Sequence, residues 1–166
     1  YDIISETEQT VEVFAEEWMS AAYNIPETVS YNGKTYTVVS IGRKAFSHRD
    51  NLTMVNIPKT VKKIGYEAFA YCSYLKNINF LGEGLVSIDD RAFYMTGIKQ
   101  FNFPSTLKTI GYEAFLSSDL AGDLVIPDGV TTIEDSAFNG CSSLTVINIP
   151  IGVTNIGEKV FEGCDS

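Results

Sequence analysis

The sequence predicts a β-rich α/β solenoid, in which short units coil behind a β-hairpin cap and stack their strands in parallel. An Ile followed five residues later by Phe recurs along the chain, with spacings of 23, 24, 22, 23 and 23 residues between successive pairs. A fixed period in this range is typical of a solenoid, because a unit that cannot bury its apolar face alone buries it against its neighbours. The six pairs are Ile41/Phe46, Ile64/Phe69, Ile88/Phe93, Ile110/Phe115, Ile133/Phe138 and Ile156/Phe161.

Each unit is expected to contain two short strands with a tight turn between them. The first strand ends at the Ile, and a turn of α-helix or 3₁₀-helix follows around an Ala-Phe pair that becomes Val160-Phe161 in the last unit. The second strand alternates apolar and polar residues, as around Phe101 and Phe103, and usually ends at Pro, which has no N–H for a strand ladder. Parallel stacking is expected to bury continuous rows of Ile, Phe and Leu.

The first forty residues are expected to form an N-terminal β cap with a degenerate first repeat. Residues 1–5 and 10–14 alternate around a polar turn and predict a hairpin, which would cover the open end of a solenoid. Residues 15–22 contain Trp18 and are interpreted as an aromatic lid, and residues 23–26 match the strand ending of a unit. Asn32-Gly33 predicts a two-residue type I′ hairpin turn.

The recurring unit resembles the BspA-like leucine-rich repeat of bacterial surface proteins, which reads I-G-x-x-A-F-x-x-C-x-x-L-x-x-I-x-I-P-x-x-V-x-x. The resemblance covers residues 41–166, as about five and a half repeats of 22 to 24 residues. Asp89 and Glu134 replace the Gly in two units. The resemblance implies a right-handed α/β leucine-rich repeat solenoid, a cell-surface or secreted location and adhesion to other cells or to host extracellular-matrix proteins. The Cys of the repeat is kept at Cys72, Cys141 and Cys164.

Charge and hydropathy exclude several classes of function. Lys and Arg number 12 against 21 Asp and Glu, a net charge of -9, which disfavours nucleic acid because phosphate binding needs a basic surface. No apolar run approaches the ~20 residues of a membrane span. Because the chain opens in a strand-like segment at Tyr1 and stops before the strand of its last unit, we expect a removed signal peptide or lipid anchor and a missing C-terminal remainder.

No constellation of residues predicts a catalytic centre, a metal site or a cofactor. The lone histidine, His48, lies in a polar loop without a nucleophile or an orienting group beside it in sequence, so a solvated histidine is expected. The pairs Asp89-Asp90 and Glu134-Asp135 occupy one position of the repeat without a calcium-binding pattern, and solvated turns are expected there.

The three cysteines share one position of the repeat. Free, partly buried thiols are expected, because stacked parallel side chains seldom have the torsion of a disulfide. A disulfide between Cys141 and Cys164, one unit apart, is the alternative.

The strand positions that point away from the core form the first candidate site, on the expected concave face. Asparagine occupies the position between the two inward apolar residues in five of six strands, with Val125 as the exception. Stacked amides could bond to one another along the coil, or they could form a polar floor for a ligand. The candidate ligand-binding residues are Asn56, Asn77, Asn79, Gln100, Asn102, Asp123 and Asn148, and the row begins at Asn24.

Tyrosines of neighbouring units form the second candidate site. Tyrosine is common in binding hot spots and stacks on sugars, although packing of turns on one another explains the group as well. Its members are Tyr66, Tyr71, Tyr74, Tyr94 and Tyr112.

These observations predict a non-enzymatic, cell-surface or secreted leucine-rich repeat module that binds protein or glycan. The alternative is a structural spacer or coat that displays another domain and binds nothing. No nucleic-acid partner and no oligomeric state are indicated.

Overall fold

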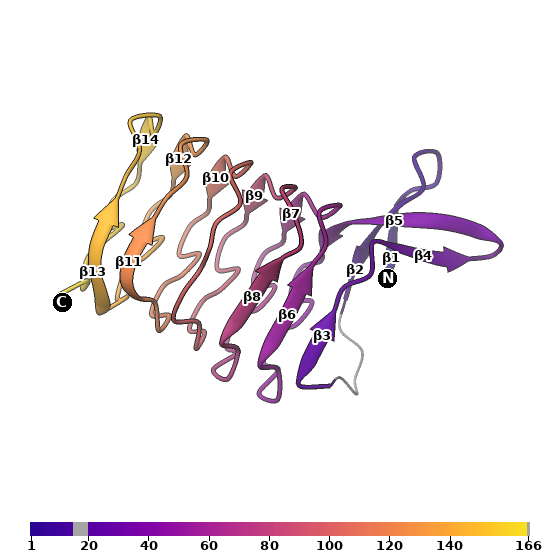
Figure 1. The fold of residues 1–166 in the computed structure, drawn as a ribbon, viewed down its shortest axis with the longest axis horizontal. Coiled ribbons are helices and arrows are strands. Elements are labelled where there is room, and N and C mark those ends of the chain that lie inside the picture. Colours follow the sequence, from indigo (N-terminus) through magenta and orange to yellow (C-terminus); the bar gives the residue numbers. More distant parts are fainter. Residues whose placement is uncertain (15–19, 166) are drawn as a thin grey trace.

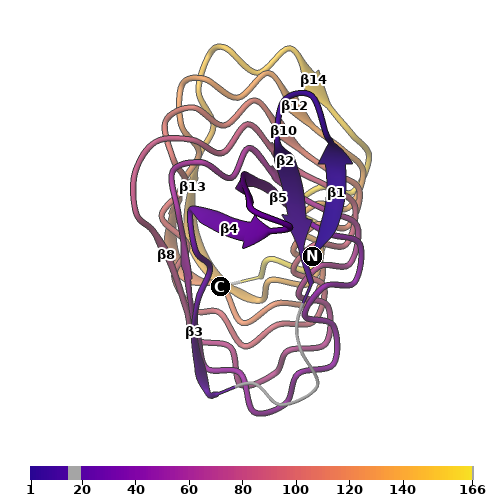
Figure 2. The same cartoon turned by 90° about the vertical axis from the view of Figure 1, so that its right-hand side faces the viewer.

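The computed structural model describes residues 1–14 and 20–165, which form a rod of stacked turns of a coil (Figure 1). Seen along the rod, the turns lie behind one another, with strands on two opposite sides of the cross-section (Figure 2). The described residues contain no helix, and therefore none that could cross a membrane.

One side of the coil carries a nine-stranded sheet that runs the length of the rod in the order β1-β2-β5-β7-β9-β10-β12-β14, with β4 paired to β5. From β5 onward each unit adds one parallel strand that ends at the Ile of the repeat, as predicted. The strands are β1 (Asp2–Ser5), β2 (Thr10–Val13), β4 (Thr28–Tyr31), β5 (Lys34–Ile41), β7 (Lys63–Ile64), β9 (Ser87–Ile88), β10 (Thr109–Ile110), β12 (Thr132–Ile133) and β14 (Asn155–Ile156).

The opposite side, called the strand face from here on, carries the second strands of five units, counting the degenerate first one, in two separate parallel sheets. The sheet β3-β6-β8 is followed along the rod by the pair β11-β13 (Figure 1). These strands are β3 (Ala22–Asn24), β6 (Met54–Ile57), β8 (Asn77–Phe80), β11 (Ala121–Val125) and β13 (Ser143–Asn148).

The predicted hairpins at the N-terminal end are confirmed. β1 and β2 pair antiparallel, and the β4–β5 hairpin projects from the end of the rod (Figure 1). Asn32 and Gly33 both have positive φ, 50° and 73°, as a type I′ turn requires. β3, in the segment predicted as a degenerate first repeat, pairs parallel with β6. The predicted lid residue Trp18 lies outside the described residues.

Rows of identical positions form the core. The Phe of each unit stacks on the next with centroid distances of 5.0 to 5.7 Å and interplanar angles of at most 13°. The first five members of the Phe row are fully buried, and Phe161 is half-buried. The Ile row is likewise buried up to Ile133, whereas Ile156 is 52% exposed. The predicted rows are therefore confirmed, and they loosen at the last unit.

The predicted α-helical or 3₁₀ turns are wrong. In the second unit, residues 65–68 and 69–72 instead form two four-residue turns whose third residues, Glu67 and Tyr71, have positive φ of 51° and 63°. Positive φ at the third residue is the mark of a type II turn, and a left-handed residue stops a right-handed helix from continuing. Left-handed residues recur at these two positions in all six units, at Lys44, Glu67, Arg91, Glu113, Ser136 and Lys159 and at His48, Tyr71, Met95, Ser117, Gly140 and Gly163.

Hydrogen bonds between units replace those that a helix would form within each unit. The N–H of Phe46 donates to the carbonyl of Ala68 at 2.7 Å, and the N–H of Phe69 donates to the carbonyl of Ala92 at 2.8 Å. Because buried backbone donors must be paired, this ladder satisfies the turn region without any helix.

The strand predicted around Phe101 and Phe103 is also wrong, because residues 99–104 form no strand. Both inward positions of this unit carry Phe, and the two rings pack with centroids 4.7 Å apart. Phe101 also packs on Phe93 and Phe115, at 5.0 and 4.9 Å. We attribute the lost pairing to the bulk of these rings, which keeps the segment from the strand spacing of about 4.8 Å. The strand face divides here.

Candidate functional site

The division of the strand face leaves a groove, called the gap groove from here on. Three adjoining cavities of about 640, 670 and 300 Å³ lie along residues 99–104 between β8 and β11. The two larger cavities share Lys99 and Gln100, and the smallest shares Asn102 and Phe103 with the first. The gap groove is lined chiefly by Asn77, Asn79, Lys99, Gln100, Asn102, Phe103 and Asp123.

Backbone N–H groups of the segment in this groove lack hydrogen-bond partners in the described part of the chain. The N–H groups of residues 100–103 donate to no described residue, whereas the carbonyl of Lys99 accepts the N–H of Ala121 at 2.9 Å. Elsewhere on the strand face, backbone groups pair between neighbouring strands. Unpaired donors beside an open cavity are available to water or to a ligand.

A β-bulge forms one wall of the groove. Gly122 has a φ of 73°, and the register of β11 against β13 shifts between Gly122 and Asp123. Leu124 follows Leu120 by four positions, whereas the corresponding step in the other units is three. Gly122 pairs with Leu144 and Asp123 pairs with Val146, so Thr145 of β13 is the extra residue of the bulge and Asp123 lies in the outward row. The Asp123 carboxylate accepts a hydrogen bond from the Thr145 hydroxyl at 3.3 Å.

Two lysines of adjacent units line the cavity of about 670 Å³ at the start of the strand positions. The Nζ of Lys76 lies 3.6 Å from a carboxylate oxygen of Asp119 and donates to the carbonyl of Ser73. Lys99 forms no ion pair with any residue in the described part of the chain, and its side chain is exposed. One unbalanced cation therefore lies at the groove.

Stacked amides, predicted as one interpretation of the Asn row, are confirmed on the N-terminal side of the gap. The Nδ2 of Asn56 donates to Asn24, and the Nδ2 of Asn79 donates to Asn56 at 2.8 Å. The amide ladder ends at Asn79, because Asn102 in the next unit forms no side-chain hydrogen bond with a described residue. Asn148 lies on β13, paired with Val125 outside the groove.

The predicted tyrosines lie on the turns, and all of them except Tyr74 contact a neighbouring ring or guanidinium. Tyr71 stacks on His48 with centroids 4.4 Å apart and contacts Tyr94 edge-on at 5.2 Å, so neighbouring rings cover part of its surface. His48 is exposed as predicted, with its ring held in this stack. The guanidinium of Arg43 covers the ring of Tyr66 at 4.7 Å, and Tyr74, 60% exposed, has no ring contact among the described residues.

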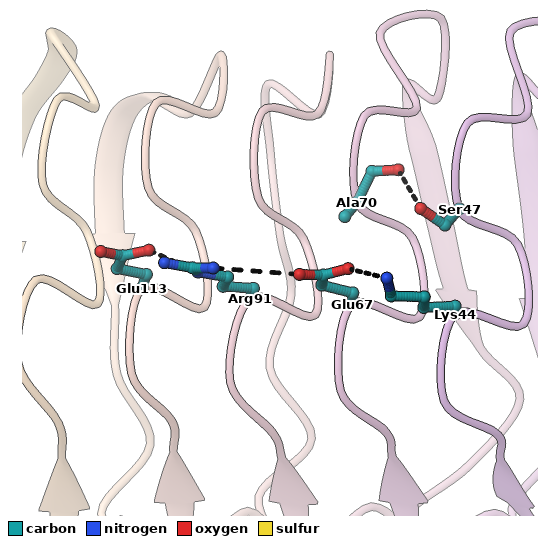
Figure 3. A network of polar contacts seen from close by, with 6 residues as sticks. All are labelled: Lys44, Ser47, Glu67, Ala70, Arg91 and Glu113. Carbon is teal, nitrogen blue, oxygen red and sulfur yellow. Dashed lines mark hydrogen bonds and ion pairs between the residues drawn. The ribbon is translucent and has the colours of Figure 1, made fainter.

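A ladder of alternating charges crosses four successive units (Figure 3). Lys44, Glu67, Arg91 and Glu113 occupy the first left-handed position of four successive units, and their ion pairs measure 3.2, 3.9 and 2.6 Å. Burial opposes ionisation of Glu67, but hydrogen bonds from Tyr66 and Lys44 and the nearby cations outweigh it and lower the pKa of its carboxyl. The charges on this face are thus paired with one another.

The carboxylate pairs accept hydrogen bonds from neighbouring units, and the cysteines pack in or against the core. Asp90 and Glu134 each accept the backbone N–H of Tyr112 at 3.2 Å. The three cysteines are free thiols, and Cys72 and Cys141 are buried. Each thiol lies 3.0 to 3.3 Å from a Phe carbonyl of the preceding unit, and burial raises the pKa of both buried thiols to about 11.

Five of the seven predicted residues of the strand face are brought together in the gap groove: Asn77, Asn79, Gln100, Asn102 and Asp123. Sequence reasoning missed Lys99, Phe103 and the bulge at Gly122. Two signals in the sequence could have identified the gap groove: Phe at both inward positions of one unit, and the longer step from Leu120 to Leu124.

A coil of parallel strands with one open polar strand face is the architecture of a leucine-rich repeat solenoid. The model of the BspA type leucine rich repeat region matches residues 39–166 in six copies, and the chain belongs to this family. A comparison with curated proteins finds no match.

Solved structures of bacterial leucine-rich repeat proteins share the fold. One from Bacteroides ovatus is 38% identical, with a TM-score of 0.77 over 86% of this chain and 37% of that protein. The leucine-rich repeat protein of T. pallidum is 26% identical, with a TM-score of 0.75 over 97% of this chain and 84% of that protein. A leucine-rich cell surface protein of Faecalibacterium prausnitzii, 24% identical, has a TM-score of 0.63 over 98% of this chain and 50% of that protein. The chain thus spans little more than a third of the B. ovatus protein.

Proposed function

We propose that this chain is a non-enzymatic, cell-surface or secreted module that binds a protein or glycan partner across its strand face, in an adhesion-type interaction. The observation that carries the proposal is the gap groove, where an exposed polar row coincides with unpaired backbone donors and open cavities. Extended solenoid surfaces commonly bind partners that span several units. Membership of the BspA-type family supports the surface location.

The groove favours a polar ligand over a large dry interface. Gln100 and Asn102 are uncharged, exposed and able both to donate and to accept hydrogen bonds. On the N-terminal side of the gap, Asn24, Asn56 and Asn79 already bond to one another and are less available to a partner. Binding therefore centres on the gap.

The test is a screen of this chain on glycan and extracellular-matrix arrays, followed by affinity measurements with two matched variants. Gln100→Ala with Asn102→Ala removes the amides of the groove, and we expect it to weaken binding by about 5- to 150-fold, as loss of two hydrogen bonds at ~0.5 to 1.5 kcal/mol each implies. Tyr71→Ala with Tyr94→Ala is the control on the turns. Undiminished binding by the first variant, with loss in the second, would move the site to the tyrosines.

A structural spacer remains the second candidate function, and a specific observation favours it. The amide ladder and the charge ladder satisfy polar side chains along the rod without any partner. Such a spacer would bind nothing on either array, and Gln100→Ala with Asn102→Ala would then leave every measured property except stability unchanged.

A further inference from the structure

We infer that the gap groove takes an acidic glycan, an oligosaccharide whose sugars carry carboxylates, and that Lys99 binds one of those carboxylates. This inference rests on the proposed function and names the class of ligand for the same groove.

Lys99 supplies the charge complementarity. Its side chain lines both larger cavities and has no acidic partner in the described chain, although acidic residues outnumber basic ones by 21 to 12. Lys76, one unit away in the same cavity, is held by Asp119 and by the carbonyl of Ser73. A carboxylate entering this end of the groove therefore meets a free ammonium group without having to break an existing ion pair.

The floor beyond Lys99 suits the hydroxyls and the apolar face of a sugar ring. Asn77, Gln100 and Asn102 offer amides that both donate and accept, as neighbouring hydroxyls require. Phe103 is only partly buried and contributes apolar ring surface to two of the cavities. This combination of a few polar groups with an aromatic surface is typical of small-ligand sites.

Two features favour a glycan over an acidic peptide. The carboxylate of Asp123, on the far wall, needs hydrogen-bond donors, which sugar hydroxyls supply and acidic side chains do not. The free N–H groups of residues 100–103 lie within the face, between β8 and β11. Residues 99–104 already lie between β8 and β11, so a water or a hydroxyl can reach into the gap, whereas an added peptide strand would have to displace this segment to pair with either sheet edge.

The experiment measures binding of three probes by calorimetry at low salt: a galacturonic acid oligosaccharide, its methyl ester and an oligoglutamate peptide of similar charge. We expect the acid to bind more tightly than the other two. Lys99→Gln should weaken binding of the acid by about 2- to 5-fold, the effect of one exposed charge pair, and should leave the ester unchanged. Lys108→Gln, the same charge change outside the gap groove, should affect neither.

Three results would overturn the inference. Equal loss in Lys99→Gln and Lys108→Gln would mean diffuse attraction, equal affinity for oligoglutamate would mean that charge alone is recognised, and absence of binding by the acid would exclude this ligand class. Equal affinity for acid and ester, still weakened by Gln100→Ala with Asn102→Ala, would overturn the recognition of carboxylates and leave the proposed function standing.

Discussion

Truncation of Phe93 to Ala should cost about 3 to 5 kcal/mol of unfolding free energy. Phe93 is fully buried, with Phe69 and Phe115 stacked on its two sides at 5.2 and 5.1 Å and Phe101 edge-on at 5.0 Å. Because these neighbours are held in stacks of their own, the cavity cannot collapse, and residual cavity volume costs about 24 cal/mol per Å³. We therefore expect a loss near the upper end of the range.

The same change at the end of the row should cost much less. Phe161 is half-buried, and Phe138, at 5.7 Å, is its one ring contact in the part of the chain that the structure describes. The strand of that unit, β14, is the last in its sheet, and Ile156 is 52% exposed. Local opening of the last unit exposes Phe161 already, so Phe161→Ala should cost under about 1.5 kcal/mol.

Urea unfolding followed by circular dichroism measures both losses, with stability taken from the midpoint at constant m-value. Tyr74→Ala, an aromatic truncation at a 60% exposed position, is the control and should stay within about 0.5 kcal/mol of the parent. Equal losses at Phe93 and Phe161 would refute the argument that stacking on both sides sets the magnitude.

Three further predictions concern other rows of the coil. Burial raises the pKa of the Cys72 and Cys141 thiols to about 11, so a thiol reagent at pH 8 should label Cys164 first. All three thiols should react after unfolding without reductant. If two thiols appeared only on reduction, a disulfide would be present. Glu67→Gln should lose about 1 to 2 kcal/mol at pH 7. Because the Glu67 pKa is lower in the folded chain, its contribution to the free energy of unfolding is complete above the pKa of an unfolded glutamate and is lost as pH falls through the folded value. Melts of parent and variant should therefore converge in acid. A stability difference that stays constant with pH would contradict the charge ladder. In Gly111→Ala, the added Cβ would lie 2.7 Å from backbone atoms of the preceding unit, so thermal melts should show a loss of about 1 to 3 kcal/mol, and an unchanged melting temperature would contradict that close approach.

The rows of the core could be predicted from the sequence because one physical requirement, burial against the next unit, repeats at a fixed period. The turns could not. Their left-handed positions carry residues such as Lys44, Glu67 and Tyr71, which do not announce positive φ, and glycine appears there only at Gly140 and Gly163. An Ala-Phe pair among polar residues then resembles a short helix. The bonds that decide against a helix run between units.

Most outward residues of the candidate site could be predicted from the sequence. The loss of strand pairing that opens the groove could not. Alternation of Phe101 and Phe103 correctly indicates which side chains point inward, since both rings pack in the core. Alternation carries no information on whether the backbone reaches a neighbouring strand, which here depends on side-chain volume. The groove therefore depends on a three-dimensional packing effect. Lys99 could be assigned to the groove only once the surrounding cavities were known.

The left-handed turns divide the surface of the coil into two zones with different freedom to mutate. At positions such as Tyr71 and Met95, a β-branched residue would be strongly disfavoured, and only glycine adopts the left-handed backbone without a steric cost. On the strand face, extended backbone at Asn77 or Asp123 accepts nearly any side chain. Natural drift or a combinatorial library can therefore vary the residues of the strand face almost freely, whereas the left-handed turn positions accept fewer residue types. A repertoire of recognition surfaces on this scaffold is most readily drawn from the strand side of the rod.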